Sequence, residues 1–290
     1  MLCIFNPEHD LCLAKGRWNY VPPRSAVEFA RRDASLMQVL YPDAHCTSVY
    51  DLSAEVARGA DSVVAWGWDA VVKHELMKRG VAECLLPTDG DIATIRELQH
   101  RSTVIPLQTD VVRVVGVSEV EARLREIGHV VLKAPWSGAG RGLRWVREML
   151  SQIDTAWIEK TVQEQGCVIV EPRRQVRFDL ALEYYVDGGA AAFKGYSLFR
   201  TSSGVYRENY RLSDDKIRRR IHRAIWPYVS RLDKRKGEIE AWLTDNIAPR
   251  YRGPLGVDLM VGADRRIYLS EINFRHTMGM VAHENIRTKS

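Results

Sequence analysis

The chain has 290 residues, of which 46% are hydrophobic, so it is long enough to bury the core of one large domain or two ordinary ones. Its formal net charge of +5 is mild for this length and gives no reason to expect a nucleic-acid partner. No apolar run approaches the roughly 20 residues of a transmembrane helix, and five scattered cysteines without C-x-x-C spacing favour free thiols in a reducing cytoplasm.

Short apolar runs alternate with helical patterns over the first hundred residues, which predicts an α/β layer of mostly parallel strands. Strands are expected at "MLCIF", "CTSVY" and "SVVAW". One helix is expected to begin at Ser25, because Ser25 and Glu28 have the spacing of a capping box. Another is expected to run from an N-cap at Asp69 to a terminator at Gly80.

The polar segment "FNPEHDLCLAKGRWNYVPP" directly follows the first predicted strand and is interpreted as a loop. Ligands of parallel α/β sheets bind beyond the carboxyl ends of the strands. The polar side chains at the start of this segment are therefore candidates for contacts with an acceptor substrate: Asn6, Glu8, His9 and Asp10.

A helix that leads into Pro106 marks the predicted domain boundary near residue 100. Beyond it, a capped helix is expected from Ser118, with Glu121 at capping-box spacing, to Gly128. Strands are expected at "HVVLKAP", "LRWV" and "CVIVEP", with a helix at "DTAWIEKTVQEQG" before the last of them. Long strands then follow, joined at a Gly188-Gly189 turn. Two helices, at about 213–232 and 237–248, precede a final hairpin, "GVDLMVGADRRIYLSEIN".

A glycine-rich loop follows the strand that ends at Lys133, in "VVLKAPWSGAGRGL". Its glycines, Gly138, Gly140 and Gly142, permit a close approach of backbone N–H groups to an anion, and the lysine adds a positive charge that favours phosphate. The spacing is neither that of a Walker A loop nor that of a dinucleotide fingerprint. A mobile surface hairpin explains such a loop about as well as a phosphate site does.

Acidic and amide side chains gather in the final predicted hairpin. Glu271 and Asn273 are two residues apart and therefore share one face of a strand, and Asp258 on the partner strand can lie beside them. Three oxygen ligands on one surface suit Mg²⁺, which commonly bridges the phosphates of a nucleotide. The alternative is a solvated strand face with one satisfied buried carboxylate.

Taken together and in this order, these motifs resemble the ATP-grasp superfamily, over roughly residues 95–280. The resemblance implies an ATP-grasp fold of the α/β (α+β) class, preceded by a Rossmann-like domain at residues 1–100. The ATP-grasp part at 101–290 would then divide into a small lid subdomain, 101–172, and a larger metal-binding subdomain, 173–290.

The resemblance also implies roles for individual residues in binding ATP and Mg²⁺. "IVEP" resembles the hinge that contacts adenine, which assigns Glu171 and Pro172 to the nucleotide, and Asp179 resembles the acidic residue that binds the ribose. The metal ligands would be Asp258, Glu271 and Asn273, and the phosphate contacts Lys133, the glycine loop and Arg101. Arg275 completes an E-x-N-x-R pattern and is, with Lys133, the candidate catalytic residue.

Two positions depart from the family pattern. Arg101 stands where a lysine is common, and Gly256 stands where some members have an arginine. Contact with the transferred phosphate is therefore open between Arg275 and three arginines of the segment "LFRTSSGVYRENYR": Arg200, Arg207 and Arg211.

The expected activity is that of an ADP-forming ligase, in which ATP activates a carboxylate as an acyl phosphate that an amine or similar nucleophile attacks. The carboxylate substrate is a small molecule or a peptide, and neither a nucleic acid nor a membrane is expected as a partner. Two alternatives stay open: an ATP-grasp-like kinase that phosphorylates a small molecule, and a nucleotide-binding protein without turnover. The sequence leaves the oligomeric state open.

Overall fold

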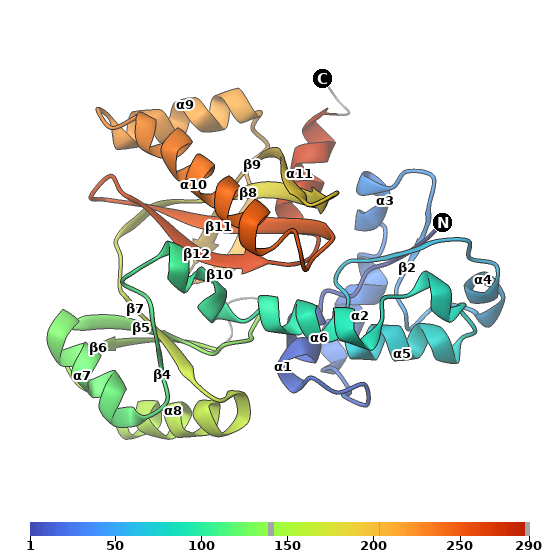
Figure 1. The fold of residues 1–290 in the computed structure, drawn as a ribbon, viewed down its shortest axis with the longest axis horizontal. Helices are drawn as coiled ribbons and strands as arrows, with labels where there is room; N and C mark the ends of the chain where they lie inside the picture. The colour runs from blue at the N-terminus through green and yellow to red at the C-terminus, as the bar shows by residue number, and fades with distance from the viewer. Residues whose placement is uncertain (139–141, 203, 288–290) are drawn as a thin grey trace.

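The computed structural model describes residues 1–138, 142–202 and 204–287, and these build three β-sheets with helices packed on them (Figure 1). The sheets have the strand orders β2-β1-β3, β4-β7-β5-β6 and β10-β9-β8-β11-β12. No helix in the described ranges is both long and apolar enough to cross a membrane.

The first sheet is parallel, as the alternating pattern predicts. Its strands are β1 (Leu2–Ile4), β2 (His45–Thr47) and β3 (Val63–Ala65). Both faces are buried, since Leu2 and Ile4 pack in one apolar cluster while Cys3 and Phe5 pack in another. The helices and 3₁₀ turn around this sheet are α1 (His9–Lys15), α2 (Arg24–Arg32), α3 (Leu36–Leu40), α4 (Ala54–Arg58), α5 (Ala70–Lys78) and η1 (Glu83–Leu85).

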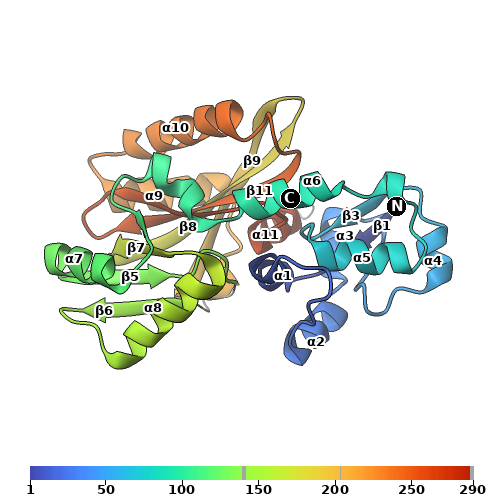
Figure 2. The same ribbon diagram turned by 60° about the horizontal axis from the view of Figure 1, so that its bottom comes forward.

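The second sheet is antiparallel and carries two helices. Its strands are β4 (Val112–Val114), β7 (Val168–Pro172), β5 (His129–Lys133) and β6 (Leu143–Arg147). Helices α7 (Val117–Ile127) and α8 (Gln152–Gln165) cover the face away from the third sheet (Figure 2). The connection from the first sheet runs through α6 (Asp89–Leu98) and the 3₁₀ helix η2 (Arg101–Leu107).

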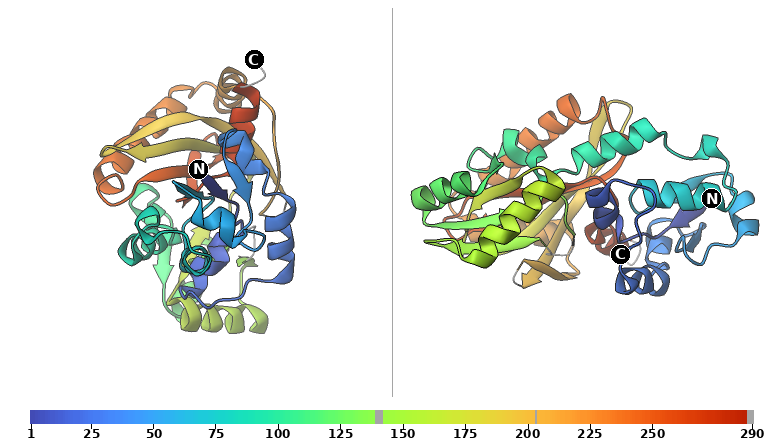
Figure 3. Two further views of the ribbon diagram at one scale, coloured as in Figure 1. Left: turned by 90° about the vertical axis from the view of Figure 1, so that its right-hand side faces the viewer. Right: turned by 90° about the horizontal axis from the view of Figure 1, so that it is seen from below.

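The third sheet is the largest. Its strands are β8 (Val176–Asp187), β9 (Ala190–Ser202), β10 (Val205–Asn209), β11 (Gly253–Gly262) and β12 (Ile267–Asn273). Leu180, Leu182 and Tyr184 alternate along β8 into the main core. Helices α9 (Asp214–Ile225) and α10 (Ser230–Asn246) supply the facing side of that core. The opposite face of the sheet, with Asp179 and Glu183, lines a cavity. After β12, the chain continues into α11 (Met278–Arg287), which lies toward the first sheet (Figure 3).

Several local predictions are confirmed. Asp69 is the N-cap of α5 and accepts hydrogen bonds from the backbone N–H groups of Val71 and Val72. Gly188 and Gly189 have φ of 58° and 81° and join β8 to β9 as a two-residue hairpin. The final hairpin is β11–β12, and all five cysteines are free.

Other local predictions are wrong. Ser25 and Ser118 lie inside α2 and α7, whose N-caps are Pro23 and Gly116, because each helix begins before the serine. The predicted helix after Ser25 also breaks at Asp33 into α2 and α3.

Three further segments differ from the predictions. Pro106 lies inside η2, whereas α6 already ends at Leu98. The segment taken as a polar loop after the first strand contains α1, which starts at His9. Helix α11 at the end of the chain was not predicted.

Candidate active site

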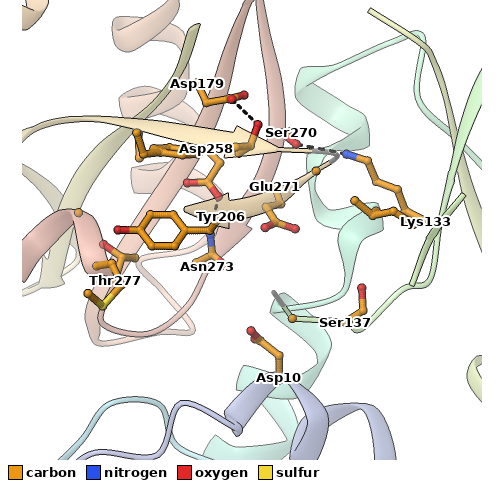
Figure 4. A pocket seen from close by; sticks show the side chains of 18 of the residues that line it. Asp10, Lys133, Ser137, Asp179, Tyr206, Asp258, Ser270, Glu271, Asn273 and Thr277 are labelled. Carbon is orange, nitrogen blue, oxygen red and sulfur yellow. Dashed lines mark hydrogen bonds between the residues drawn. The ribbon is translucent and has the colours of Figure 1, made fainter. Parts of the chain in front are cut away.

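A cavity of about 780 Å³ is lined by residues of the second and third sheets and by residues that follow β1 and β3 of the first sheet. The β11–β12 hairpin, β5, the segment after β1 and Thr277, just before α11, each contribute polar side chains to it (Figure 4). The cavity therefore brings together segments from the beginning, middle and end of the chain.

The β11–β12 hairpin brings the three predicted metal ligands together. Asp258 pairs directly with Glu271 across the two strands, and the Nδ2 of Asn273 donates a 3.0 Å hydrogen bond to Oδ2 of Asp258. The register shifts after Asp258, so that the next pair joins Leu259 to Leu269 and leaves Ser270 as an extra residue. This bulge lets Ser270 and Glu271, although consecutive, both line the cavity.

Two carboxylates and one amide oxygen form a donor set that fits Mg²⁺. Burial raises the pKa of Asp258 well above its ordinary value, and the charges of Glu271 and Glu183 raise it further. A divalent cation would offset this accumulation of negative charge. Over the described residues, no three His, Cys, Asp or Glu side chains are arranged to hold a metal ion, so the candidate site depends on Asn273 as its third ligand.

Lys133 faces the cavity and is almost fully buried. Its Nζ forms a 2.8 Å ion pair with Oε1 of Glu171 and donates a 3.2 Å hydrogen bond to Oγ of Ser270. β5 and β7 are antiparallel neighbours, which explains why these two side chains meet. Pro172 also lines the cavity, so both residues of the predicted hinge lie at its wall.

Arg101 reaches the hairpin from the start of η2. Its guanidinium forms a 2.7 Å ion pair with Oε2 of Glu271 and donates hydrogen bonds to the carbonyl oxygens of Ala134 and Ser137, at 2.8 and 3.0 Å. The Arg101 side chain is 8% exposed. It therefore fixes Glu271 and the beginning of the glycine-rich loop relative to each other.

Arg275 joins the end of β12 to the start of α1. Its Nη2 lies 3.0 Å from Oδ2 of Asp10 and donates a second hydrogen bond, of 3.1 Å, to Oδ1 of Asn273. Burial opposes ionisation of Asp10, but the charge and hydrogen bond of Arg275, together with the charges of His9 and Arg101, outweigh this effect and lower the pKa of the carboxyl group. The pair connects the first sheet to the predicted metal ligands.

Two glycines of the loop after β5 have intramolecular reasons to be glycine. A Cβ at Gly138 would lie 2.9 Å from Oδ2 of Asp10, and Gly142 has a φ of 72° that favours glycine. Gly138 lines the cavity, whereas Gly140 lies outside the described residues.

Asp179 lies on the cavity wall and accepts a 2.7 Å hydrogen bond from Oγ1 of Thr201. Arg200, Arg207 and Arg211 are exposed and do not line the cavity. Of the four candidates after β1, Glu8 and Asp10 line the cavity. Asn6 donates a 3.0 Å hydrogen bond to Asp69, and His9 lies 3.3 Å from the same carboxylate, so both connect β1 to α5.

Glu183 is a buried cavity residue that the sequence analysis missed. Its two carboxylate oxygens accept hydrogen bonds from Oγ of Ser197 (2.9 Å) and Oγ1 of Thr277 (2.8 Å), and burial raises its pKa to about 7. The signal was present in the alternation of β8, since Glu183 and Asp179 share a face opposite the leucines.

Two glycines make room for Glu183. A Cβ at Gly256 would lie 2.9 Å from its Oε2, and one at Gly279 would collide with its Oε1. This explains the second departure from the family pattern, the glycine at position 256. An arginine at position 256 has no space, because Glu183 and Thr277 fill it.

Comparisons with known proteins identify solved structures with a similar fold. No family model and no curated protein sequence matches the chain, but many solved structures resemble it. N5-carboxyaminoimidazole synthetase from Staphylococcus aureus, complexed with ADP, has a TM-score of 0.53 and 10% identity, over 94% of this chain and 70% of that one. Biotin carboxylase from Campylobacter jejuni, as a β-γ-ATP complex, has a TM-score of 0.53 and 16% identity, over 98% of this chain and 67% of that one.

D-alanyl-alanine synthetase A from Vibrio cholerae is similar at a TM-score of 0.50 and 13% identity, over 79% of this chain and 74% of that one. These structures share the ATP-grasp fold. The protein thus has the ATP-grasp fold, and the resemblance inferred from its motifs is confirmed at the level of the fold.

Proposed function

We propose that the protein is an ATP-dependent, ADP-forming ligase that activates a carboxylate as an acyl phosphate for attack by an amine or similar nucleophile. One observation carries the proposal: Asp258, Glu271 and Asn273 converge on a cavity that also contains Lys133 and Arg275. The nucleotides bound in the structural neighbours support ATP as the substrate of this fold.

In this proposal the nucleotide lies between the second and third sheets. The hinge residues Glu171 and Pro172 contact the adenine, and Asp179 binds the ribose. Lys133, Arg101 and two glycines of the loop after β5, Gly138 and Gly142, lie on the phosphate side. We also propose that the parallel sheet belongs to a Rossmann-like domain spanning 1–100, followed by the lid subdomain 101–172 and the metal-binding subdomain 173–290.

Asp258, Glu271 and Asn273 would hold Mg²⁺, which supplies charge neutralisation at the phosphates when bound. The chain's own cations complete the charge balance. In the nucleotide complex Lys133 would turn from Glu171 to the phosphates, and Arg275 would stabilise the transferred phosphoryl group. The acyl phosphate reacts readily with water, so the burial of these side chains serves to exclude water from the intermediate.

Release of ADP and free phosphate tests the proposal. Asp258→Ala and Glu271→Ala should each abolish ADP release, whereas Asp245→Ala, which alters an exposed residue of α10, should leave it unchanged. A kinase would leave the transferred phosphate on its substrate. Release of ADP without free phosphate would therefore show that the protein is a kinase and not a ligase. Unchanged turnover in both hairpin variants would remove the site assignment altogether.

A further inference from the structure

The end of the cavity beside the first sheet contains a carboxylate with one unused oxygen. Glu8 lies in the turn between β1 and α1, lines the cavity and is 3% exposed. Its Oε1 accepts a 2.6 Å hydrogen bond from the hydroxyl of Tyr50. Its Oε2 is buried and has no hydrogen-bond partner among the described residues.

A buried carboxylate oxygen without a donor costs free energy. The neighbouring polar side chains do not relieve it, since Asn6 and His9 contact Asp69, and Asp10 is paired with Arg275. Burial raises the pKa of Glu8 to about 7, although the hydrogen bond from Tyr50 favours the ionised form. Glu8 therefore lacks a cationic donor, and its position on the cavity wall allows a ligand to supply one.

The walls around Glu8 are largely apolar. Phe5, Phe29 and Trp66 line this end of the cavity, and the Phe5 ring packs edge-on against the other two, at centroid distances of 5.6 and 5.1 Å. Pro7 and Met278 also line the cavity. A ligand here meets one carboxylate within an aromatic and aliphatic surface.

We propose that this end of the cavity is a subsite, formed by Glu8, Phe5, Phe29 and Trp66, for a substrate that carries a primary ammonium group beside an apolar side chain, as amino-acid and peptide derivatives do. The ammonium group donates to Oε2 of Glu8, and the apolar side chain packs on the three aromatic rings. The inference rests on the proposed function, because it names the substrate class of the same cavity.

The charges at this end disfavour a phosphorylated acceptor. Glu8 and Asp10 both line it, and Arg275, which forms an ion pair with Asp10, is under the proposed function also engaged by the transferred phosphoryl group. A phosphate dianion would approach two carboxylates without a free cation in compensation. The structure thus favours an amino-acid-like substrate over a sugar phosphate or a nucleotide as the second substrate.

Binding of leucinamide to the full chain, measured by isothermal titration calorimetry in the presence of a non-hydrolysable ATP analogue and MgCl₂, tests the subsite without requiring turnover. Wild type should bind leucinamide at least about tenfold more tightly than N-acetyl-leucinamide, because acetylation removes the charge that pairs with Glu8. Glu8→Gln should weaken leucinamide binding by a similar factor and leave the affinity for the ATP analogue unchanged. Glu55→Gln, at an exposed position of α4, is the matched control and should bind like wild type.

Two results would overturn the subsite. One is equal binding, or no binding, of leucinamide and its acetylated form by wild type, a comparison that does not depend on the folding of any variant. The other is competition by ribose 5-phosphate for leucinamide. Failure of the ligase proposal has a different signature, namely leucinamide binding as expected, together with no release of ADP and phosphate by wild type or with unchanged release by Asp258→Ala and Glu271→Ala.

Discussion

Arg275 and Asp10 form an almost buried ion pair although 265 positions separate them in the chain. The pair joins the strand that carries Glu271 and Asn273 to the first helix after β1. Removing one partner leaves the other charge buried without compensation, which is costly in a protein interior.

Asp10→Ala should therefore lower the free energy of unfolding by about 3 kcal/mol. The double variant Asp10→Ala/Arg275→Ala should be less destabilised than the sum of the two single variants, because neither charge then remains unpaired. Chemical denaturation monitored by circular dichroism measures both effects. Strict additivity of the two substitutions would show that the pair does not couple the segments.

Glu183 imposes glycine at position 279. Gly279→Ala should lower the free energy of unfolding by about 1–3 kcal/mol, since the added methyl group collides with the carboxylate and with Ser197. Gly237 of α10 has open space around it, so Gly237→Ala should instead stabilise the protein by up to about 1 kcal/mol. The melting temperature should fall in Gly279→Ala and rise in Gly237→Ala. An unchanged melting temperature in Gly279→Ala would contradict the packing described around Glu183.

His276 should make the stability depend on pH. Burial lowers its pKa to about 4, and its Nε2 lies 2.8 Å from the hydroxyl of Tyr41. The unfolded chain takes up this proton near pH 6.5, so the contribution of His276 is fully present above that pH and is lost as the pH falls toward 4. The expected loss is up to about 3 kcal/mol.

The measurement is the difference in unfolding free energy between wild type and His276→Asn as a function of pH. The comparison is needed because the raised pKa of Glu8 and of Glu183, both about 7, contributes a change of the opposite sign between pH 4.5 and 7. The difference should shrink as the pH is lowered from 6.5 to 4. A constant difference would mean that His276 titrates alike in the folded and unfolded chain.

Lys133 should be essential for turnover under the proposed function. Lys133→Met removes the charge facing the phosphates and should reduce the rate of ADP release by about 100-fold or more. Lys160→Met changes an exposed lysine of α8 and is the control. If ADP release falls equally in both variants, or in neither, Lys133 does not act on the nucleotide.

The sequence predicted the β11–β12 hairpin well because a two-residue period fixes which side chains share a face. Asp258, Glu271 and Asn273 are brought together by that period and by the pairing of two strands adjacent in the chain. The ion pair of Lys133 with Glu171 was not predicted, although both residues were singled out, because their contact depends on the pairing of β5 with β7.

Glu183 and Glu8 are two residues whose place in the site could not be predicted from the sequence. Glu183 is a functional candidate only because Gly256 and Gly279 leave space beside it and two hydroxyl groups hold it. Glu8 was one of four candidates in one segment for contact with the acceptor substrate. Only the folded structure distinguishes it from Asn6 and His9, whose side chains contact Asp69. Such distinctions arise from contacts between segments far apart in the chain, which local patterns do not encode.

The central claim is that one divalent cation is shared by the β11–β12 hairpin and the phosphates of ATP. A crystal structure with a non-hydrolysable ATP analogue and MgCl₂ tests it most directly. Oxygen atoms of Asp258, Glu271 and Asn273 should lie about 2.0–2.1 Å from Mg²⁺, with Lys133 turned from Glu171 to a phosphate oxygen. A cation bound elsewhere, or an analogue bound outside the cavity with the Lys133–Glu171 pair intact, would contradict it.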